Sequence, residues 1–182
     1  MANRKIAGFV ASLRQQPLNR NMGQAFMALA PAALEFGMQP IGQLPFYNQD
    51  RDDAGTPAFE WSAFRDQVLG FDGVLFFALQ YKRSLPGVLK NALEVGSHPY
   101  GKSVWNGMPG VVVTVSPGAI GDFGANHHLR QSLVRLPAPE AYIGAAAGLF
   151  DADGRPTNES TRTCAAGFME KFAAWVEANP AQ

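Results

Sequence analysis

Side chains that could bind an anion cluster between the first apolar run of the chain and the helix expected after it. Ser12, Arg14 and Asn19 supply a hydroxyl, a guanidinium and an amide close together. A helix N-terminus adds free N–H groups and a dipole that attract anions. Residues 1–34 contain four basic residues and no acidic one, which favours a bound phosphate. The spacing leaves one alternative open, a solvated turn in which Ser12 or Asn19 caps the helix.

A second polar loop lies between a buried strand and a helix further along the chain. Gln80-Tyr81-Lys82-Arg83 separates the apolar run 72–78 from a helix expected at 86–93. Open α/β sheets bind ligands where strands lead through such loops into helices. The first corner is neither a P-loop nor a G-x-G-x-x-G motif, which argues against a triphosphate or a dinucleotide bound in Rossmann style.

The elements that must position these corners alternate between apolar strands and amphipathic helices. Strands are predicted at 5–10, 38–44, 72–78, 110–115 and 141–145, and helices at 21–36, 59–69, 86–93, 126–136 and 160–178. This alternation predicts a parallel sheet that helices cover on both faces. We expect a single domain that spans residues 1–182.

Bulk composition limits the classes of partner. The chain has 182 residues, of which 47% are hydrophobic and 16% charged, and this is enough for a real core. A formal charge of +0 favours neither nucleic acid nor an anionic membrane as a partner. The single cysteine, Cys164, excludes an internal disulfide, and no apolar run reaches membrane-spanning length. We therefore expect a cytoplasmic protein.

Several segments spread over nearly the whole chain share a likeness to one family. Ala11-Ser12-Leu13-Arg14 and Pro17-Leu18-Asn19 stand where that family has Gly-Ser-Leu-Arg, two variable positions and Ser-x-Asn. Residues 78–82 and 84–91 stand where it has Thr-Pro-Glu-Tyr-Asn and Ser-x-Pro-Gly-x-Leu-Lys-Asn. Residues 116–121, 128–131 and 139–143 also match family segments. In these segments the chain resembles the NAD(P)H-dependent FMN reductase family, in its flavodoxin-like chromate and quinone reductase branch.

The resemblance implies a particular fold and assembly. The fold is a three-layer flavodoxin-like α/β sandwich whose five-stranded parallel sheet has the order 2-1-3-4-5. FMN lies at the switch point between the first and third strands. Residues 135–139 are fewer and richer in proline than in the family, so we expect a short fifth edge strand. The resemblance also implies a homodimer, with a homotetramer as the alternative that this short segment disfavours.

The residues carried over from the resemblance form a cofactor site without a catalytic side chain or a metal. Ser12, Arg14 and Asn19 would hold the FMN phosphate. Gln80, Tyr81 and Lys82 would border the isoalloxazine, and Ser116, Pro117 and Gly118 would close its other side. Pro17, Leu18 and Arg83 complete the predicted set. The flavin would take a hydride from NADPH or NADH and pass two electrons to a quinone-like, chromate, azo or flavin acceptor.

Several departures from the family pattern fall within this predicted site, and one of them is Leu79-Gln80 in place of Pro-Glu. Ala11 replaces a glycine and adds a Cβ where backbone should approach the phosphate. Pro17 replaces a serine and removes a hydroxyl and an N–H donor. Lys82 replaces an asparagine; it either stabilises an anionic reduced flavin or, as we favour, points to water. These departures motivate an alternative function, a flavodoxin-fold binding or regulatory module that has weakened or lost FMN binding.

Other residues with chemical potential have simpler interpretations. His127 and His128 favour a surface or interface role over a metal site, because adjacent helical positions face different ways. Trp105 is expected to pack, although its loop could reach over a flavin. Cys164 is expected to be a buried small residue. Residues 50–53 are expected to form a solvated acidic loop.

Overall fold

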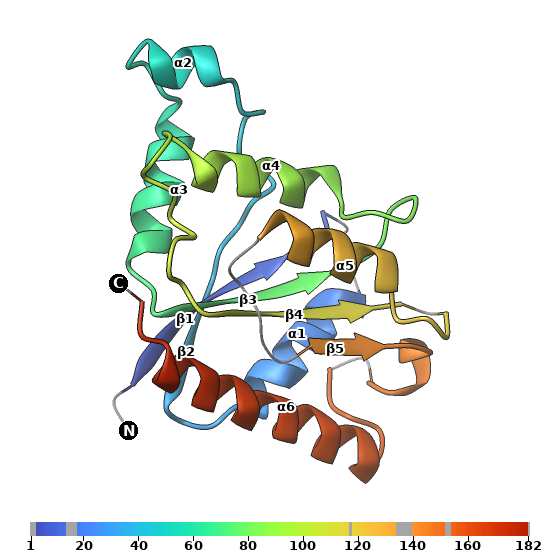
Figure 1. Cartoon of the computed structure of the whole chain (residues 1–182). Helices are drawn as coiled ribbons and strands as arrows, with labels where there is room; N and C mark the ends of the chain where they lie inside the picture. The colour runs from blue at the N-terminus through green and yellow to red at the C-terminus, as the bar shows by residue number, and fades with distance from the viewer. Residues whose placement is uncertain (1–2, 14–17, 117, 134–139, 152–153, 182) are drawn as a thin grey trace.

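The protein folds around one parallel sheet. The computed structural model describes residues 3–13, 18–116, 118–133, 140–151 and 154–181. The strands are β1 (Arg4–Val10), β2 (Leu34–Met38), β3 (Gly73–Ala78), β4 (Gly110–Val115) and β5 (Glu140–Ile143). They pair in parallel in the order β2-β1-β3-β4-β5, as Figure 1 shows. This confirms the predicted order and the short fifth strand at the edge.

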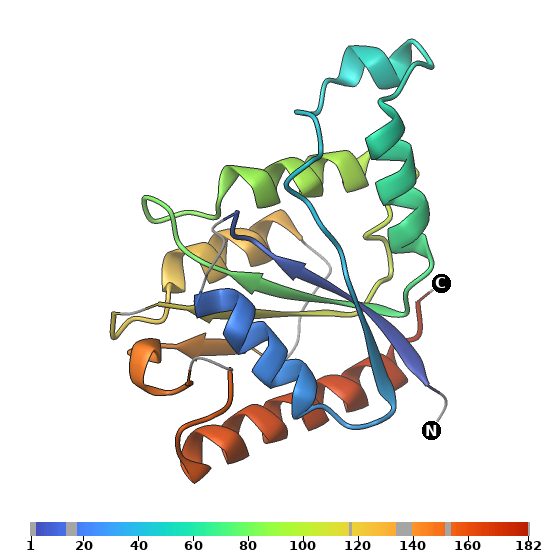
Figure 2. The same ribbon diagram turned by 180° about the vertical axis from the view of Figure 1, so that it is seen from behind.

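Helices cover both faces of the sheet. The helices are α1 (Leu18–Ala28), α2 (Gln49–Asp53), α3 (Phe59–Leu69), α4 (Gly87–Ser97), α5 (Phe123–Ser132) and α6 (Glu159–Ala178), with a 3-10 turn at Ala146–Gly148. Two opposite views place α1 and α6 on one face and α3, α4 and α5 on the other (Figures 1 and 2). None of the helices in the described ranges is long and apolar enough to span a bilayer.

The central strands are buried on both sides. Every residue of β3 and β4 is buried, which explains why both read as unbroken apolar runs. Successive side chains of a strand point to opposite faces, so Phe76 joins the core under α3 and α4 while Phe77 joins the core under α1 and α6. Trp105 is only 6% exposed and belongs to the first of these cores. Its Nε1 donates to the Leu93 carbonyl, so it does not reach over the site.

Two predicted boundaries near the N-terminus are wrong. Helix α1 ends at Ala28 instead of continuing to residue 36, and strand β2 is Leu34–Met38 instead of 38–44. Pro31 explains the early end of the helix, because it lacks an N–H and clashes with the preceding turn. After Pro31 the chain pairs with β1, from Leu34 opposite Arg4 to Met38 opposite Gly8.

Two expectations about burial are also wrong. Cys164 is exposed, because α6 turns Ala165, Phe168 and Met169 toward the core instead. Residues 50–53 are not simply a solvated loop, because they form most of α2 and the side chain of Asp52 is 3% exposed. Its carboxylate accepts two hydrogen bonds from Arg65, at 3.0 and 2.6 Å, while Arg65 Nε donates to the Val95 carbonyl. Asp52 thereby ties α2 to α3.

Replacing Asp52 by alanine should destabilise the fold, because it leaves the buried Arg65 charge without a partner. We expect Asp52→Ala to lower the free energy of unfolding by about 3–5 kcal/mol near neutral pH. The hydrogen bonds from Arg65 lower the pKa of Asp52 below its ordinary value. The Asp52–Arg65 pair therefore contributes its full stability at any pH above the ordinary pKa of aspartate. That stability is lost as the pH falls through the lowered pKa of Asp52.

Urea unfolding measured from pH 7 down to pH 2 checks this prediction. The matched control is Asp53→Ala, which removes an exposed carboxylate from the same helix. Equal losses of stability in the two variants at pH 7, or a loss from Asp52→Ala that does not shrink in acid, would contradict it.

Candidate functional site

The three predicted loops open at the same edge of the sheet. Strands β1, β3 and β4 are neighbours, with Val10 opposite Phe77 and Ala78 opposite Thr114. Their carboxyl ends therefore lie side by side, and the loops that follow them meet there. Strand β1 leads to α1 on one face and β3 leads to α4 on the other, which makes this edge the switch point where such sheets bind ligands.

The first loop leads directly into the N-terminus of α1. Ala11 is 1% exposed and its N–H donates to the Phe77 carbonyl at 2.9 Å. Its methyl group lies in the core and not on the surface of the loop. The Cβ of Ala11 therefore does not block a phosphate, contrary to the expectation from the sequence. Ser12 follows at an intermediate depth, whereas Arg14 and Pro17 lie outside the described residues. Leu18 and Asn19 open the first turn of α1, which carries no acidic residue.

The second loop is tied to α5 through Gln80. The Gln80 N–H donates to Asp122 Oδ2 at 2.8 Å, and Gln80 Oε1 accepts from the Gly124 N–H at 3.0 Å. Asp122 precedes α5 with a left-handed φ of 57°, so its carboxylate turns back toward the loop. Burial raises the pKa of Asp122, and the bond from the Gln80 N–H partly offsets this. Gln80 thus has its backbone and its side-chain oxygen engaged in holding two loops together.

The residues after Gln80 form a tight turn with exposed side chains. Tyr81 and Ser84 exchange backbone hydrogen bonds of 2.8 and 3.0 Å. Lys82 and Arg83 between them have φ values of 48° and 64°, as the central residues of a type I′ turn do. Both side chains are exposed, and for Lys82 this agrees with the interpretation that it points to water. The Tyr81 side chain is 53% exposed.

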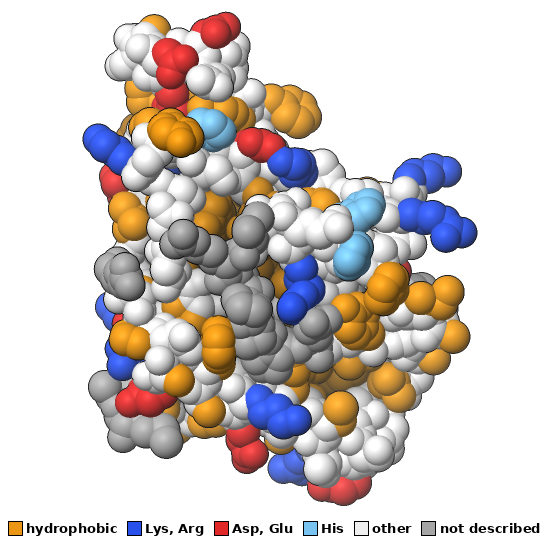
Figure 3. Space-filling view, viewed as in Figure 1, with side chains coloured by type: hydrophobic (Ala, Val, Ile, Leu, Met, Phe, Trp, Pro, Cys, Tyr) orange, Lys and Arg blue, Asp and Glu red, His pale blue; other side chains and the backbone are white. Residues whose placement is uncertain are grey.

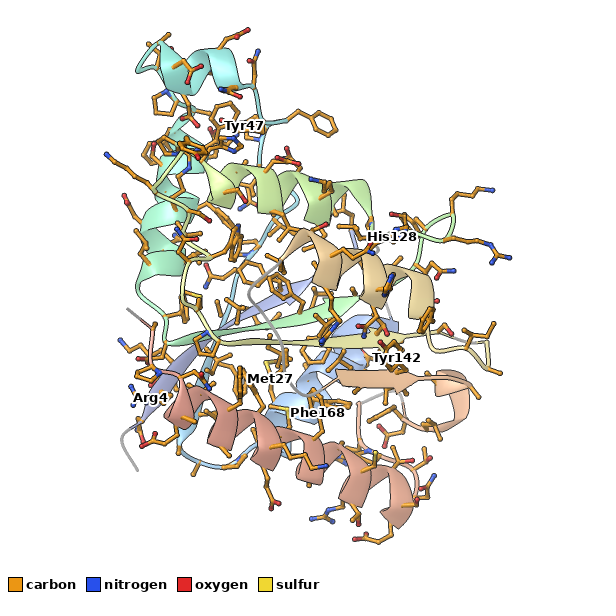
Figure 4. The ribbon with its side chains drawn as sticks, viewed as in Figure 1. Arg4, Met27, Tyr47, His128, Tyr142 and Phe168 are labelled. Atoms are coloured by element: carbon orange, nitrogen blue, oxygen red, sulfur yellow. The ribbon has the colours of Figure 1, made fainter. Side chains whose placement is uncertain are left out.

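A second contact with α5 holds the other end of this turn. His128 Nδ1 and Ser84 Oγ lie 2.9 Å apart, and Figure 4 shows His128 on α5 beside the loop that follows β3. His127 instead stacks on Phe123, which in turn stacks on Tyr142. The two histidines therefore face different ways, and His128 supports the turn. Among the described residues, no group of three or more His, Cys, Asp and Glu side chains could hold a metal ion.

The third loop is held by the strand at its side. Ser116 is 7% exposed; its N–H donates to the Ile143 carbonyl and its Oγ to the Gly118 carbonyl at 2.9 Å. Gly118 also accepts from the Ala145 N–H, while Pro117 lies outside the described residues. Below the loop, Thr114 Oγ1 donates to the Gly121 carbonyl at 2.7 Å. These bonds fix the loop against β4 and β5.

A cavity of about 680 Å³ lies to one side of this edge, between α1 and the ends of β1 and β2. Its lining includes Ser12, Met27, Met38 and Gln39. Of the predicted site residues that the structure describes, Ser12 is the one found in this lining. The cavity is thus separate from the predicted isoalloxazine contacts at 80–83 and 116–118.

Sequence reasoning missed the residues that support the site. Asp122, Gly124 and His128 contact the second loop from positions 42 to 44 residues away. Asp122 carried a local signal, since aspartate is favoured just before a helix, and His128 lies in the segment 128–131 that matches the family. All three meet their partners in the second loop only because β3 pairs with β4. A local sequence pattern does not predict such a contact.

Comparison with known proteins decides the family. The sequence profile described as NADPH-dependent FMN reductase matches residues 4–147. The chain belongs to the NADPH-dependent FMN reductase family. A quinone reductase of Pseudomonas putida is 49% identical over 181 residues, which cover 97% of this chain and 96% of that protein. A 2-hydroxy-1,4-benzoquinone reductase of a Burkholderia species is 42% identical, covering 94% and 96%.

A solved structure supports the same assignment. FerB, a flavoenzyme NAD(P)H:(acceptor) oxidoreductase from Paracoccus denitrificans, superposes with a TM-score of 0.90. It is 35% identical to this member of the FMN reductase family, and the match covers 97% of this chain and 99% of that one. The resemblance inferred from the sequence motifs is therefore confirmed, together with the flavodoxin-like fold.

Substituting Gly124 should damage the tie between the second loop and α5 of this FMN reductase family member. A Cβ at residue 124 would lie 2.7 Å from both the Arg83 carbonyl oxygen and Gln80 Oε1. We expect Gly124→Ala to lower the free energy of unfolding by about 1–3 kcal/mol, although alanine is the better helix former. Urea unfolding measures the change.

Gly87→Ala is the matched control for this substitution. Gly87 also lies in the first turn of a helix, but a Cβ there would meet nothing within 4 Å. If Gly124→Ala is as stable as Gly87→Ala, the loop that contains Gln80 can move aside at little cost. The hydrogen bond between Gln80 and Gly124 would then contribute little.

Proposed function

We propose that the protein is an FMN-dependent NAD(P)H oxidoreductase that passes two electrons from a nicotinamide to a quinone. The observation that carries the proposal is the meeting of the three predicted loops at the β1/β3 switch point in a chain of this family. Relatives named quinone reductase, matched over nearly their whole length, favour quinones among the acceptors considered.

The phosphate end of the proposed site lies at the N-terminus of α1. Ser12, Arg14 and Asn19 supply hydroxyl, guanidinium and amide donors, and Pro17 and Leu18 belong to the same stretch of sequence. The free N–H groups and dipole of α1 favour an anion there, and its first turn has no acidic residue to oppose one. The donor set therefore fits a mononucleotide phosphate.

The proposed isoalloxazine end lies between the second and third loops. Gln80 and Tyr81 border one side, with the exposed Lys82 and Arg83 at its rim, and Ser116, Pro117 and Gly118 are proposed to border the other. Bound FMN would supply the hydride and two-electron chemistry. The chain's own residues bind and orient the flavin. The bond from the Gln80 N–H to Asp122 and the bond from the Gly124 N–H to Gln80 Oε1 set the separation of the two loops, and no side chain needs to act as an acid or base.

The proposed partners are small molecules and a second copy of the chain. NADPH or NADH is the electron donor, and quinones lead chromate, azo compounds and free flavin as acceptors. A homodimer is part of the proposal because the family resemblance implies it. The exposed Phe46 and Tyr100 side chains, at 85% and 97%, are compatible with subunit contacts.

A binding or regulatory module is the second candidate function. The substitution that favours it is Pro17, which removes a hydroxyl and an N–H donor from the phosphate loop. The burial of Ala11 removes the other argument for it, because that methyl group does not occupy the loop surface. The two candidates differ in whether the protein binds FMN tightly.

Titration with FMN tests the proposal directly. Binding should quench flavin fluorescence, and the bound protein should oxidise NADH or NADPH in the presence of a quinone. Arg14→Gln should raise the Kd for FMN by ~10- to 150-fold, since one charge-assisted hydrogen bond contributes ~1.5–3 kcal/mol. Lys171→Gln removes the same charge from α6 and should leave the Kd unchanged. No quenching at high micromolar protein would sink the proposal and favour the module.

Restoring the family's serine tests the role of Pro17. Pro17→Ser returns a hydroxyl and an N–H to the phosphate loop, so we expect a Kd for FMN lower by roughly tenfold or more. The same fluorescence titration measures it. A Kd that rises in Pro17→Ser would mean instead that proline helps by preorganising the first turn of α1.

A further inference from the structure

The tip of the turn after β3 carries two neighbouring cations. Lys82 and Arg83 are both exposed, and neither forms an ion pair with any described residue. Figure 3 shows basic side chains projecting from the edge of the molecule at this turn, next to the histidines of α5. The formal charge of the whole chain is +0, so this concentration of positive charge is local.

The backbone holds these cations in an unfavourable conformation. Left-handed φ values suit glycine and asparagine, and lysine and arginine adopt them at an energetic cost. Backbone bonds between Tyr81 and Ser84, the bonds that join Gln80 to Asp122 and Gly124, and the contact between Ser84 and His128 keep the turn in place. The turn therefore presents both charges from a backbone with a defined position relative to α5.

The turn also lies at the rim of the proposed flavin site. Gln80 and Tyr81, directly before it, are proposed to border the isoalloxazine. A nicotinamide that stacks on the flavin leaves the adenosine half of its dinucleotide outside the cleft, where rim residues can reach it. Exposed cations at a rim raise the local concentration of anions and bind phosphate through charge-assisted hydrogen bonds.

We propose that Lys82 and Arg83 form an anion-recognition element that takes an oxyanion group carried by a reactant of this enzyme. Two reactants have that chemistry: NADPH, through its 2′-phosphate, and quinones with an ionised ring hydroxyl. NADH and a neutral quinone lack it. This inference rests on the proposed function. It adds to it a preference for the reactant that carries an oxyanion group over the one that lacks it.

The experiment compares the wild type with the double variant Lys82→Asn and Arg83→Asn. Asparagine removes both charges and tolerates a left-handed φ, so the turn is preserved. One arm measures kcat/KM for NADPH and NADH with a neutral quinone, and the Kd values of NADP⁺ and NAD⁺ by calorimetry. The other arm measures kcat/KM for a neutral and an ionised hydroxyquinone with NADH. Lys171→Gln on α6, on the opposite face of the sheet, is the charge control.

The double variant should lose selectivity for the charged reactant by about fivefold or more, and the loss should fade at high salt, which screens exposed charges. A loss in the nucleotide arm assigns the element to the 2′-phosphate, and a loss in the acceptor arm assigns it to the quinone. Unchanged ratios in both arms, with unchanged NADP⁺ affinity, would overturn the inference.

Separate measurements distinguish this outcome from failure of the proposed function. The FMN titration reports on flavin binding whatever the variants do, and calorimetry with NADP⁺ needs no turnover. The single variants Lys82→Asn and Arg83→Asn repeat the comparison if the double variant unfolds at a lower urea concentration than the wild type. Each should then show part of the loss.

Discussion

The hydrogen bonds between Gln80 and the start of α5 are the constraint on which the rest of the site depends. They join loops that follow two different strands, so the two proposed sides of the isoalloxazine keep one separation. The contact is close enough that residue 124 has no room for a side chain. Since a loop held in this way loses little further conformational entropy when a ligand arrives, more of the interaction energy is available for binding.

The substitutions relative to the family have unequal physical consequences. Ala11 is harmless to the loop surface because its methyl group packs in the core. Lys82 keeps the left-handed backbone that asparagine favours, so the turn survives while its charge changes. Pro17 alone removes hydrogen-bond donors that a phosphate would use. The substitutions at Ala11 and Lys82 therefore leave the backbone of the described loops in place, and the one at Lys82 changes the charge of the turn.

The sequence could predict those features that depend on neighbouring residues. The buried strands β3 and β4 and the helix α3 follow from apolar runs and helical spacing, and the family motifs supplied the strand order. The helix expected at 21–36 failed because Pro31 and the pairing of β2 with β1 overrode helical spacing. Asp52, Asp122 and His128 escaped prediction because their partners are distant in the chain and become neighbours only when the elements pack.

The left-handed backbone at residues 82 and 83 also limits how this region of the chain can diverge. Valine, isoleucine and threonine are strongly disfavoured at such φ values because of their branched Cβ, whereas asparagine, aspartate, glycine and unbranched long side chains are accommodated more readily. Substitutions at residues 82 and 83 that change charge or polarity therefore strain the backbone less than substitutions to β-branched apolar residues. The charge at this tip can therefore change while the backbone that carries it keeps its conformation.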